Sequence, residues 1–180
     1  PPDRPPRILF CRTPRYMWPI LSEADNFLIP LGYLCLAAAL RESMPDVEIK
    51  LIDCPVQQLG WGSLEALMRE WQPDMVCAGD EAIYVHESAK LFRTAKRANP
   101  ECITVGGGFT LPHVPEWALG PGSCDYLVFG EGEITFTELV TTLRYGGDLS
   151  TVAGLRYLDT DGTVKDTGFR TLIRNLDDLP

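Results

Sequence analysis

Short apolar runs alternate along the chain with longer segments in which apolar residues recur every three or four positions. Such runs are typical of strands buried on both faces of a parallel sheet, and the periodic segments are typical of the helices that connect them. The predicted strands are RILFC (7–11), VEIKLID (47–53), DMVCAG (74–79), CITVG (102–106) and DYLVFG (125–130). The alternation predicts an α/β fold, doubly wound and Rossmann-like or flavodoxin-like, with five parallel strands in the order 2-1-3-4-5.

Five helices are expected between and after these strands. The pattern places them at 32–43, at 63–71, from Tyr84 to Ala98, in a short stretch near Pro112 that contains EWAL, and from Thr135 to the glycines Gly146 and Gly147. Thr135 with Glu138 three residues later has the spacing of a capping box, which predicts that the last helix begins there.

The texture changes after Gly147. Residues 154–166, GLRYLDTDGTVKD, are two alternating runs around Asp161 and Gly162, a pattern that predicts a β-hairpin. The chain then ends on RNLDDLP, which we interpret as a linker. We therefore expect a Rossmann-like domain over 1–147 and a hairpin with a linker over 148–180.

Composition excludes several classes of partner. The formal net charge of -9 and a pI near 4.7 disfavour nucleic acid and anionic membrane surfaces, because phosphates would be repelled. No apolar stretch approaches the roughly 20 residues that cross a bilayer, and PPDRPPR lacks the apolar core of a secretory signal. The sequence predicts a cytoplasmic protein with no membrane or nucleic-acid partner.

The six cysteines are spread singly, so this chain holds no CxxC or CxxxCxxC cradle for zinc or an iron–sulfur cluster. Most of them stand inside apolar runs, where a reduced thiol packs as a small hydrophobic group. No metal ligands are predicted.

Glycines follow two of the predicted strands. Gly106, Gly107 and Gly108 come at the end of the fourth, and FGEGE (129–133) ends the fifth. Ligands of open parallel sheets lie beyond the carboxyl ends of the strands, and glycine there permits close approach to the backbone. The alternative for the glycines is a tight turn. The two glutamates disfavour phosphate at the next helix and suit hydrogen-bond donors, or they are only helix-start acids.

Several classes of nucleotide-binding and hydrolytic protein are disfavoured, because the loops after the strands lack their motifs. The loop after the first strand, CRTPRYMW, lacks GxGxxG; the chain contains no GxxxxGK[ST] and no GxSxG; and a receiver domain would need acids after the first strand. The histidines, His86 and His113, are expected to be surface or capping residues.

Taken together, the loops resemble the N-terminal cobalamin-binding domain of cobalamin-dependent radical S-adenosylmethionine enzymes. The matching pieces are IPLGYLCLAAALRE (29–42), LIDC (51–54), QPDMVCAG (72–79), ITVGGGFT (103–110), PEWAL (115–119), CDYLVFGEGEITFTEL (124–139), VAGLRYLDTDG (152–162) and NLDDLP (175–180). They span nearly the whole chain, and GEGE with the terminal LDDLP is the most specific combination.

The resemblance implies a domain that clamps cobalamin, followed in the same chain by a barrel with CxxxCxxC, a [4Fe–4S] cluster and S-adenosylmethionine. NLDDLP is similar to the junction into that barrel. The implied activity belongs to the longer enzyme, a methyltransferase that uses methylcobalamin, or an enzyme of ring formation or rearrangement. A different class remains open, a non-catalytic cobalamin carrier or interaction module.

The resemblance also assigns cofactor-binding residues. The cobalamin tail would be lined by Gly106, Gly107, Gly108 and Thr110, with Ala78, Gly79 and Asp80 opposite, Gly130, Glu131 and Gly132 closing the site, and Tyr16, Met17 and Trp18 beside or under the corrin ring. For the three residues of the first loop, packing of an interdomain surface is an equal alternative. The DxHxxG motif of other cobalamin domains is missing after the first strand, so we expect no histidine ligand to cobalt.

Overall fold

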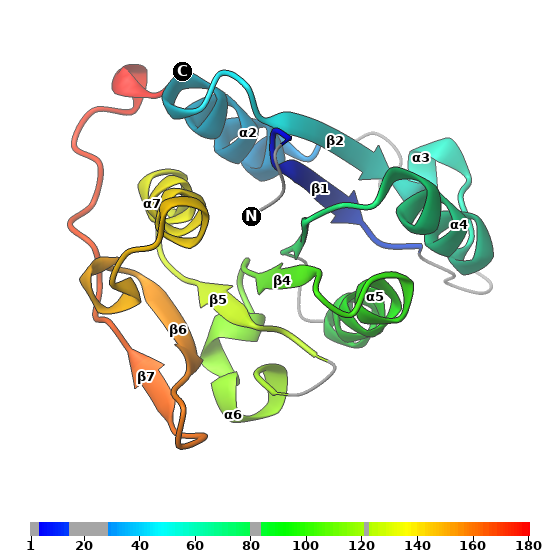
Figure 1. The fold of residues 1–180 in the computed structure, drawn as a ribbon. Coiled ribbons are helices and arrows are strands. Elements are labelled where there is room, and N and C mark those ends of the chain that lie inside the picture. The colour runs from blue at the N-terminus through cyan, green and yellow to red at the C-terminus, as the bar shows by residue number, and fades with distance from the viewer. Residues whose placement is uncertain (1–3, 15–28, 80–83, 121–122) are drawn as a thin grey trace.

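The structure, a computed structural model, describes residues 4–14, 29–79, 84–120 and 123–180. A single sheet runs through these residues in the order β2-β1-β3-β4-β5-β6-β7 (Figure 1). Its strands are β1 (Arg7–Arg12), β2 (Glu48–Asp53), β3 (Met75–Ala78), β4 (Ile103–Gly106), β5 (Tyr126–Val128), β6 (Leu155–Leu158) and β7 (Val164–Asp166). The first five strands are parallel, whereas β6 and β7 are antiparallel to their neighbours.

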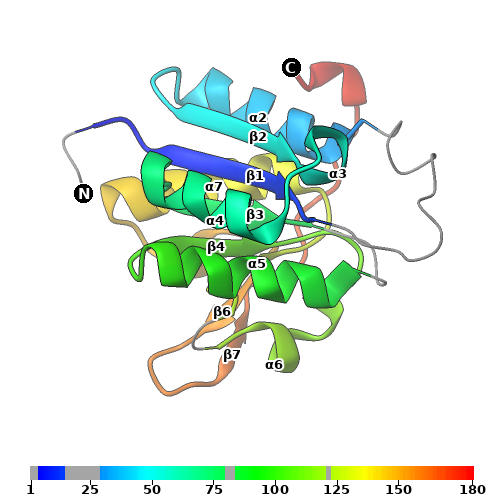
Figure 2. The same ribbon diagram turned by 90° about the vertical axis from the view of Figure 1, so that its right-hand side faces the viewer.

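Helices cover both faces of the sheet (Figures 1 and 2). One face carries α2 (Leu31–Ser43) and α7 (Gly132–Tyr145), and the other carries α4 (Trp61–Trp71) and α5 (Val85–Ala98). Two one-turn helices, α3 (Cys54–Gln57) and α6 (Pro115–Ala118), follow β2 and β4. Single 3-10 turns occur at Leu111–His113, Leu149–Thr151 and Leu176–Asp178.

The inner strand β1 shows why an unbroken apolar run becomes a buried strand. Leu9 and Cys11 face the core under α4 and α5, while Ile8 and Phe10 face the core under α2 and α7. All four side chains are at most 1% exposed. Because successive side chains of a strand point to opposite faces, a strand with helices on both sides must be apolar at every position. The predicted α/β class is confirmed.

The sheet is larger than the five strands predicted from the sequence, because the C-terminal hairpin extends it. β6 pairs with β5, with Leu127 opposite Arg156 and Val128 opposite Leu155. The parallel part would otherwise end at β5 with unpaired backbone groups, and the hairpin covers that edge. The predicted hairpin itself is confirmed, and the sheet has seven strands.

The predicted start of the last helix is also wrong. α7 begins at Gly132, one turn before Thr135, and Glu131 occupies its N-cap position. Thr135 lies inside the helix with its hydroxyl donating to the carbonyl of Ala153 at 2.8 Å, so it caps nothing. Glu138 pairs instead with Arg170. The spacing of a capping box thus arose from two side chains that bind the later part of the chain.

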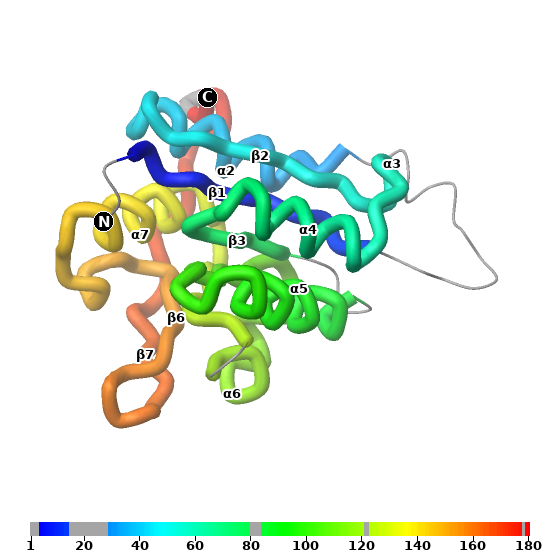
Figure 3. Tube along the Cα trace, turned by 45° about the vertical axis from the view of Figure 1, so that its right-hand side comes forward, coloured from blue at the N-terminus to red at the C-terminus, as the bar shows by residue number. Residues whose placement is uncertain are grey.

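The C-terminal chain returns to the first helix. After β7 it passes α7 and ends beside α2 (Figures 1 and 3), where Leu179 and Pro180 share a hollow with Ala39, Glu42 and Ser43. Among the residues that the structure describes, none of the helices has the length and apolar character that a membrane crossing requires.

Candidate functional site

A slot opens at the carboxyl ends of the parallel strands, between the sheet and the first turns of α2 and α7. Its volume is about 280 Å³. We call it the α2/α7 slot. Its walls are formed by Phe10, Gly32, Tyr33, Leu36, Cys77, Ala78, Gly79, Val105, Gly106, Gly107, Gly108, Val128, Gly130, Glu131, Gly132, Glu133 and Phe136. This is the edge at which open parallel sheets bind ligands.

The glycines of the slot have different reasons to be glycine. A Cβ atom at Gly106 would lie 2.9 Å from Cδ2 of Leu127, so this position is filled by the core. Gly108 has a φ of 75°, which favours glycine at a turn. A Cβ atom at Gly107 would meet only the carbonyl oxygen of Val128, at 3.5 Å. Gly107 is therefore the glycine of this run whose missing side chain leaves space for a ligand.

The backbones after β3 and β4 lie against each other at the slot. A Cβ atom at Gly79 would be 3.2 Å from the amide nitrogen of Gly108 and 3.3 Å from the carbonyl carbon of Gly107. Because these neighbours are main-chain atoms, they cannot move aside as a flexible side chain can. Gly79 thus permits the two strand ends to form one continuous wall.

Tyr33 ties this wall to β1. Its hydroxyl accepts a hydrogen bond from the amide nitrogen of Gly79 at 2.8 Å and lies 3.3 Å from the carbonyl oxygen of Cys11, to which it donates. Its ring stacks on Phe10 with centroids 5.7 Å apart. The ring of Phe136 is tilted against that of Phe10, with centroids 5.3 Å apart. The interior of the slot is therefore aromatic, whereas the wall after β3 and β4 is bare backbone.

The third wall comes from the turn between β5 and α7. Gly130 has a φ of 75°, which turns the chain sharply toward the helix. A Cβ atom at Gly132 would lie 3.1 Å from Cδ2 of Leu36, so glycine there lets α7 approach α2 closely. Glu131 stands between them without capping α7, because its carboxylate accepts a hydrogen bond from the amide nitrogen of Ile173 at 2.5 Å.

A buried ion pair lies at the same edge of the sheet. Nη1 of Arg12, at the end of β1, is 3.1 Å from Oδ2 of Asp53, at the end of β2. The two side chains are 8% and 10% exposed. Removing one partner would leave a buried charge, so the pair fixes the strand ends from which the first loop departs.

Most of the residues assigned from the sequence come together in the slot. Ala78 and Gly79 face the run Gly106–Gly108 across adjacent strands, and Gly130, Glu131 and Gly132 close the third side. Thr110 is half-buried and does not line the slot; it begins the 3-10 turn after β4. Asp80, Tyr16, Met17 and Trp18 lie outside the described residues.

Sequence reasoning missed the walls that the core elements supply. These are Phe10, Gly32, Tyr33, Leu36, Cys77, Val105, Val128, Glu133 and Phe136. A signal for some of them exists in the sequence. Tyr33 and Leu36 are three positions apart on α2, and Phe136 is four positions after Gly132 on α7, so each set shares one helix face. Which face turns toward the sheet was not deducible from spacing alone.

The described side chains provide no set of metal ligands. Groups of three or more His, Cys, Asp or Glu side chains that could hold an ion do not occur among them. His86 and His113 are both exposed, neither lines the slot, and the ring of His86 meets that of Trp117.

The cysteines behave as packing residues. Five of the six are buried, and all are free thiols. Burial raises the pKa of Cys102 from 9.0 to about 12, and it raises the pKa of Cys77 and Cys124 as well. A thiol with so high a pKa stays protonated and unreactive at neutral pH. The predicted role as small hydrophobic groups is confirmed for these three.

Comparison with known proteins agrees with this geometry. Residues 17–140 match the B12 binding domain family. An uncharacterized methyltransferase of Pyrococcus horikoshii is 32% identical over 152 residues, which are 84% of this chain and 32% of that protein. The hopanoid C-3 methylase of Methylococcus capsulatus is 35% identical over 141 residues, which are 75% of this chain and 26% of that protein. The chain thus spans about a third of the length of these relatives or less.

A solved structure has the same fold. The radical S-adenosylmethionine methyltransferase TsrM of Kitasatospora setae, with cobalamin and a [4Fe–4S] cluster bound, matches with a TM-score of 0.69 at 19% identity, over 98% of this chain and 31% of that chain. The resemblance to the cobalamin-binding domain of cobalamin-dependent radical S-adenosylmethionine enzymes is confirmed. The chain belongs to the B12 binding domain family.

Proposed function

We propose that the α2/α7 slot receives the nucleotide tail of cobalamin, with the corrin ring beyond the carboxyl edge of the sheet. The observation that carries the proposal is the bare backbone wall of Gly79, Gly107 and Gly108 in a member of this family. The proposed contact residues are Ala78, Gly79, Asp80, Gly106, Gly107, Gly108, Thr110, Gly130, Glu131 and Gly132 at the tail, and Tyr16, Met17 and Trp18 at the ring.

The slot fits such a tail in shape and in chemistry. An aromatic part of the tail would meet the connected rings of Phe10, Tyr33 and Phe136 chiefly at Tyr33, because the other two are at most 1% exposed. Polar groups of the tail can bind backbone amides along the glycine wall, where no side chain keeps them at a distance. The share of this chain in any reaction would be to bind the cofactor and to present the reactive face of the corrin to the substrate.

We further propose that no histidine of this chain binds cobalt. The absence of DxHxxG after β1 and the exposed positions of His86 and His113 away from the slot support this. The test is an electron paramagnetic resonance spectrum of the protein with cob(II)alamin, made once with ordinary and once with ¹⁵N-labelled histidine. Identical spectra are expected, and a label-dependent nitrogen splitting would contradict the proposal.

The longer protein is proposed to be a radical S-adenosylmethionine methyltransferase. Two relatives named as a methyltransferase and a methylase support this, and the matched residues are 32% and 26% of their lengths. Methylcobalamin held by residues 1–147 would supply the methyl group, and residues 148–180 would lead to a barrel that binds a [4Fe–4S] cluster and S-adenosylmethionine. A cytoplasmic location accompanies this proposal.

The protein encoded by the complete gene tests the enzymatic part. Its sequence after residue 180 is expected to contain CxxxCxxC. The purified protein is expected to bind four irons per chain, as one cluster, and to cleave S-adenosylmethionine to 5′-deoxyadenosine on reduction. A complete protein that binds cobalamin but lacks the cysteine motif would instead be a carrier or interaction module.

A further inference from the structure

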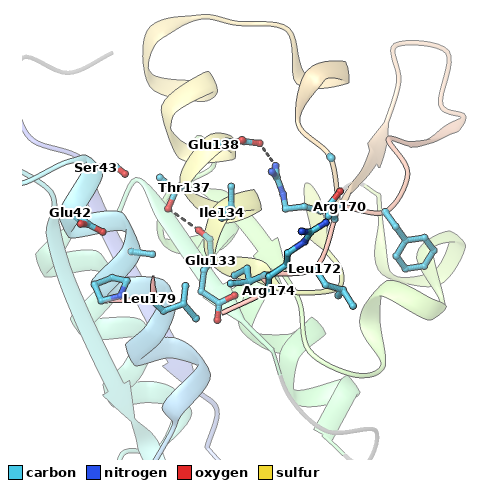
Figure 4. Close-up of a pocket in the computed structure, with 16 residues that line it drawn as sticks. Glu42, Ser43, Glu133, Ile134, Thr137, Glu138, Arg170, Leu172, Arg174 and Leu179 are labelled. Carbon is cyan, nitrogen blue, oxygen red and sulfur yellow. Dashed lines mark hydrogen bonds and ion pairs between the residues drawn. The ribbon is translucent and has the colours of Figure 1, made fainter. Parts of the chain in front are cut away.

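An irregular segment connects the hairpin to the rim of the α2/α7 slot. We call residues 168–174 the strap. Its first residue is fixed, because the amide nitrogen of Gly154 donates to the carbonyl of Gly168 at 2.8 Å. Beyond that point it crosses a hollow of about 910 Å³ between α2 and α7, shown in Figure 4. Phe169 and Leu172 are 80% and 69% exposed, so the strap buries little apolar surface of its own.

One side chain holds the middle of the strap on α7. The guanidinium of Arg170 forms an ion pair with the carboxylate of Glu138 (Figure 4), and its Nε donates to the hydroxyl of Thr135 at 3.0 Å. The side chain of Arg170 is 18% exposed, so solvent screens this pair less than a fully exposed one. The strap also contacts the turn before α7, where the rings of Phe169 and Phe129 meet with centroids 5.1 Å apart.

The far end of the strap binds the rim of the slot. The amide nitrogen of Ile173 donates to Oε2 of Glu131 at 2.5 Å. Glu131 lines the slot and is the N-cap residue of α7, yet its side chain does not cap that helix. The strap therefore determines where the carboxylate of Glu131 lies.

The position of this charge matters for a phosphate-bearing ligand. If the strap left α7, the nearest unpaired donors for Glu131 would be the amides of the first turn of α7, which is the natural position of an N-cap side chain. That turn, Gly132 and Glu133, lines the slot. The tail of cobalamin carries a phosphodiester, and a carboxylate turned toward it would repel it.

We propose that the strap is a positioning element for the α2/α7 slot: Arg170 docks it on α7, and its Ile173 amide holds the Glu131 carboxylate away from a phosphate-bearing tail. This rests on the proposed function of the slot as the site of the cobalamin tail. Because binding couplings are reciprocal, tail binding should in turn strengthen the docking of the strap. The chain that follows the hairpin is thereby linked to the state of the cofactor site.

A double-mutant cycle tests this coupling. Affinity for hydroxocobalamin is measured by titration for the wild type, Arg170→Ala, Glu131→Gln and the double variant. Arg170→Ala is expected to bind about tenfold more weakly, and less so at high salt, because it frees a charged Glu131. In the Glu131→Gln background the same change of Arg170 should have little effect, because no charge is released. Arg170→Lys, which lacks the Nε donor, should fall between.

A matched control variant distinguishes the specific effect of Arg170 on cobalamin affinity from a general effect of net charge. Arg174 belongs to the same strap and is exposed, and Arg174→Ala changes the net charge equally. It should leave the affinity unchanged. Hydrogen exchange of residues 169–174 gives a second readout: cobalamin should slow it in the wild type, and Arg170→Ala should speed it in the free protein.

The outcomes are distinguishable. Binding by the wild type with equal affinity in Arg170→Ala, or a loss that persists in full in the Glu131→Gln background, overturns the role of the strap and leaves the slot as the cobalamin site. Failure of the wild type to bind hydroxocobalamin overturns both. A loss for Arg174→Ala as large as for Arg170→Ala would show a net-charge effect instead.

Discussion

The two edges of the parallel sheet are held together by different means. At the amino edge, Asp74 accepts hydrogen bonds from both Nη atoms of Arg4, at 2.7 and 2.8 Å, and from the amide of Arg7 at 2.8 Å. Asp125 before β5 likewise binds Thr104 and Lys96. The two carboxylates there bind side chains and backbone amides of neighbouring segments. Such contacts stabilise the ends of the strands.

At the carboxyl edge the buried Arg12–Asp53 pair joins β1 to β2, whereas around the slot the connections are made by backbone and by one hydroxyl. Gly79 touches the main chain of Gly107 and Gly108, and the hydroxyl of Tyr33 joins Gly79 to Cys11. Where the wall of the slot is bare backbone, no side chain keeps a ligand at a distance. If the proposed function holds, the amino edge supplies stability and the slot at the carboxyl edge supplies the binding site.

The largest loss of cobalamin affinity is expected when a side chain fills the space at the carboxyl edge. Gly107→Leu should lower cobalamin affinity by roughly hundredfold or more, because its side chain would occupy the slot. The fold should persist, since Gly107 has no positive φ and its Cβ direction is open. Titration and circular dichroism measure the two effects. Gly62→Leu, at an exposed position of α4 with an open Cβ direction, is the matched control and should bind normally.

A smaller effect is expected from the clamp on the slot wall. Tyr33→Phe removes the acceptor of the half-buried Gly79 amide, so cobalamin affinity should fall about tenfold and stability by about 1 kcal/mol. Tyr145→Phe, on an exposed side chain at the end of α7, should change neither. Equal cobalamin affinities of Tyr33→Phe and the wild type would show that the hydroxyl of Tyr33 has no role in cobalamin binding.

A variant at the amino edge should lose stability but keep its affinity for cobalamin. Asp74→Asn weakens the contacts with Arg4 and Arg7 and should lower the free energy of unfolding by about 1–2 kcal/mol, as urea denaturation would measure. Cobalamin affinity measured on the folded protein should not change. A fall in affinity as large as that of Tyr33→Phe would contradict the division between the two edges.

The smallest expected effect concerns Cys102, which precedes β4 at the amino edge. Burial raises the pKa of its thiol from 9.0 to about 12, so the unfolded chain releases this proton first as the pH rises. The stability that the buried thiol contributes is complete below pH 9 and is lost between pH 9 and 12. Cys102→Ala should lose less stability than the wild type between about pH 8 and about pH 10.5, measured by urea unfolding. Parallel losses would assign the pH dependence to other groups.

The parts of the fold that depend on local pattern were predictable from the sequence. Short apolar runs such as ILFC (8–11) are typical of strands covered on both faces, and the glycines after β3, β4 and β5 marked the edge that contains the slot. Contacts between distant segments were not predictable. Nothing in the hairpin sequence specifies that β6 extends β5, and nothing near Thr135 or Glu138 reveals that they bind Ala153 and Arg170.

The glycine run shows the same limit within the site. Gly106, Gly107 and Gly108 are indistinguishable in sequence, yet one is fixed by the Leu127 side chain, one leaves ligand space, and one makes a turn. The aromatic wall of Phe10, Tyr33 and Phe136 was not predicted from the sequence. These residues lie within β1, α2 and α7, where an aromatic side chain is equally consistent with a core position. Only the packing of α2 and α7 on the sheet shows that these rings border an opening.

The central claim, that the slot at the carboxyl edge binds the cobalamin tail, is tested most directly by titrating the purified chain with hydroxocobalamin. Gel filtration and a visible spectrum of the eluted protein follow. One cobalamin per chain is expected to co-elute with the protein. Its spectrum should be base-off, because a tail that occupies the slot cannot keep its base bound to cobalt. Elution of free cobalamin, or a bound form with the base-on spectrum, would contradict it.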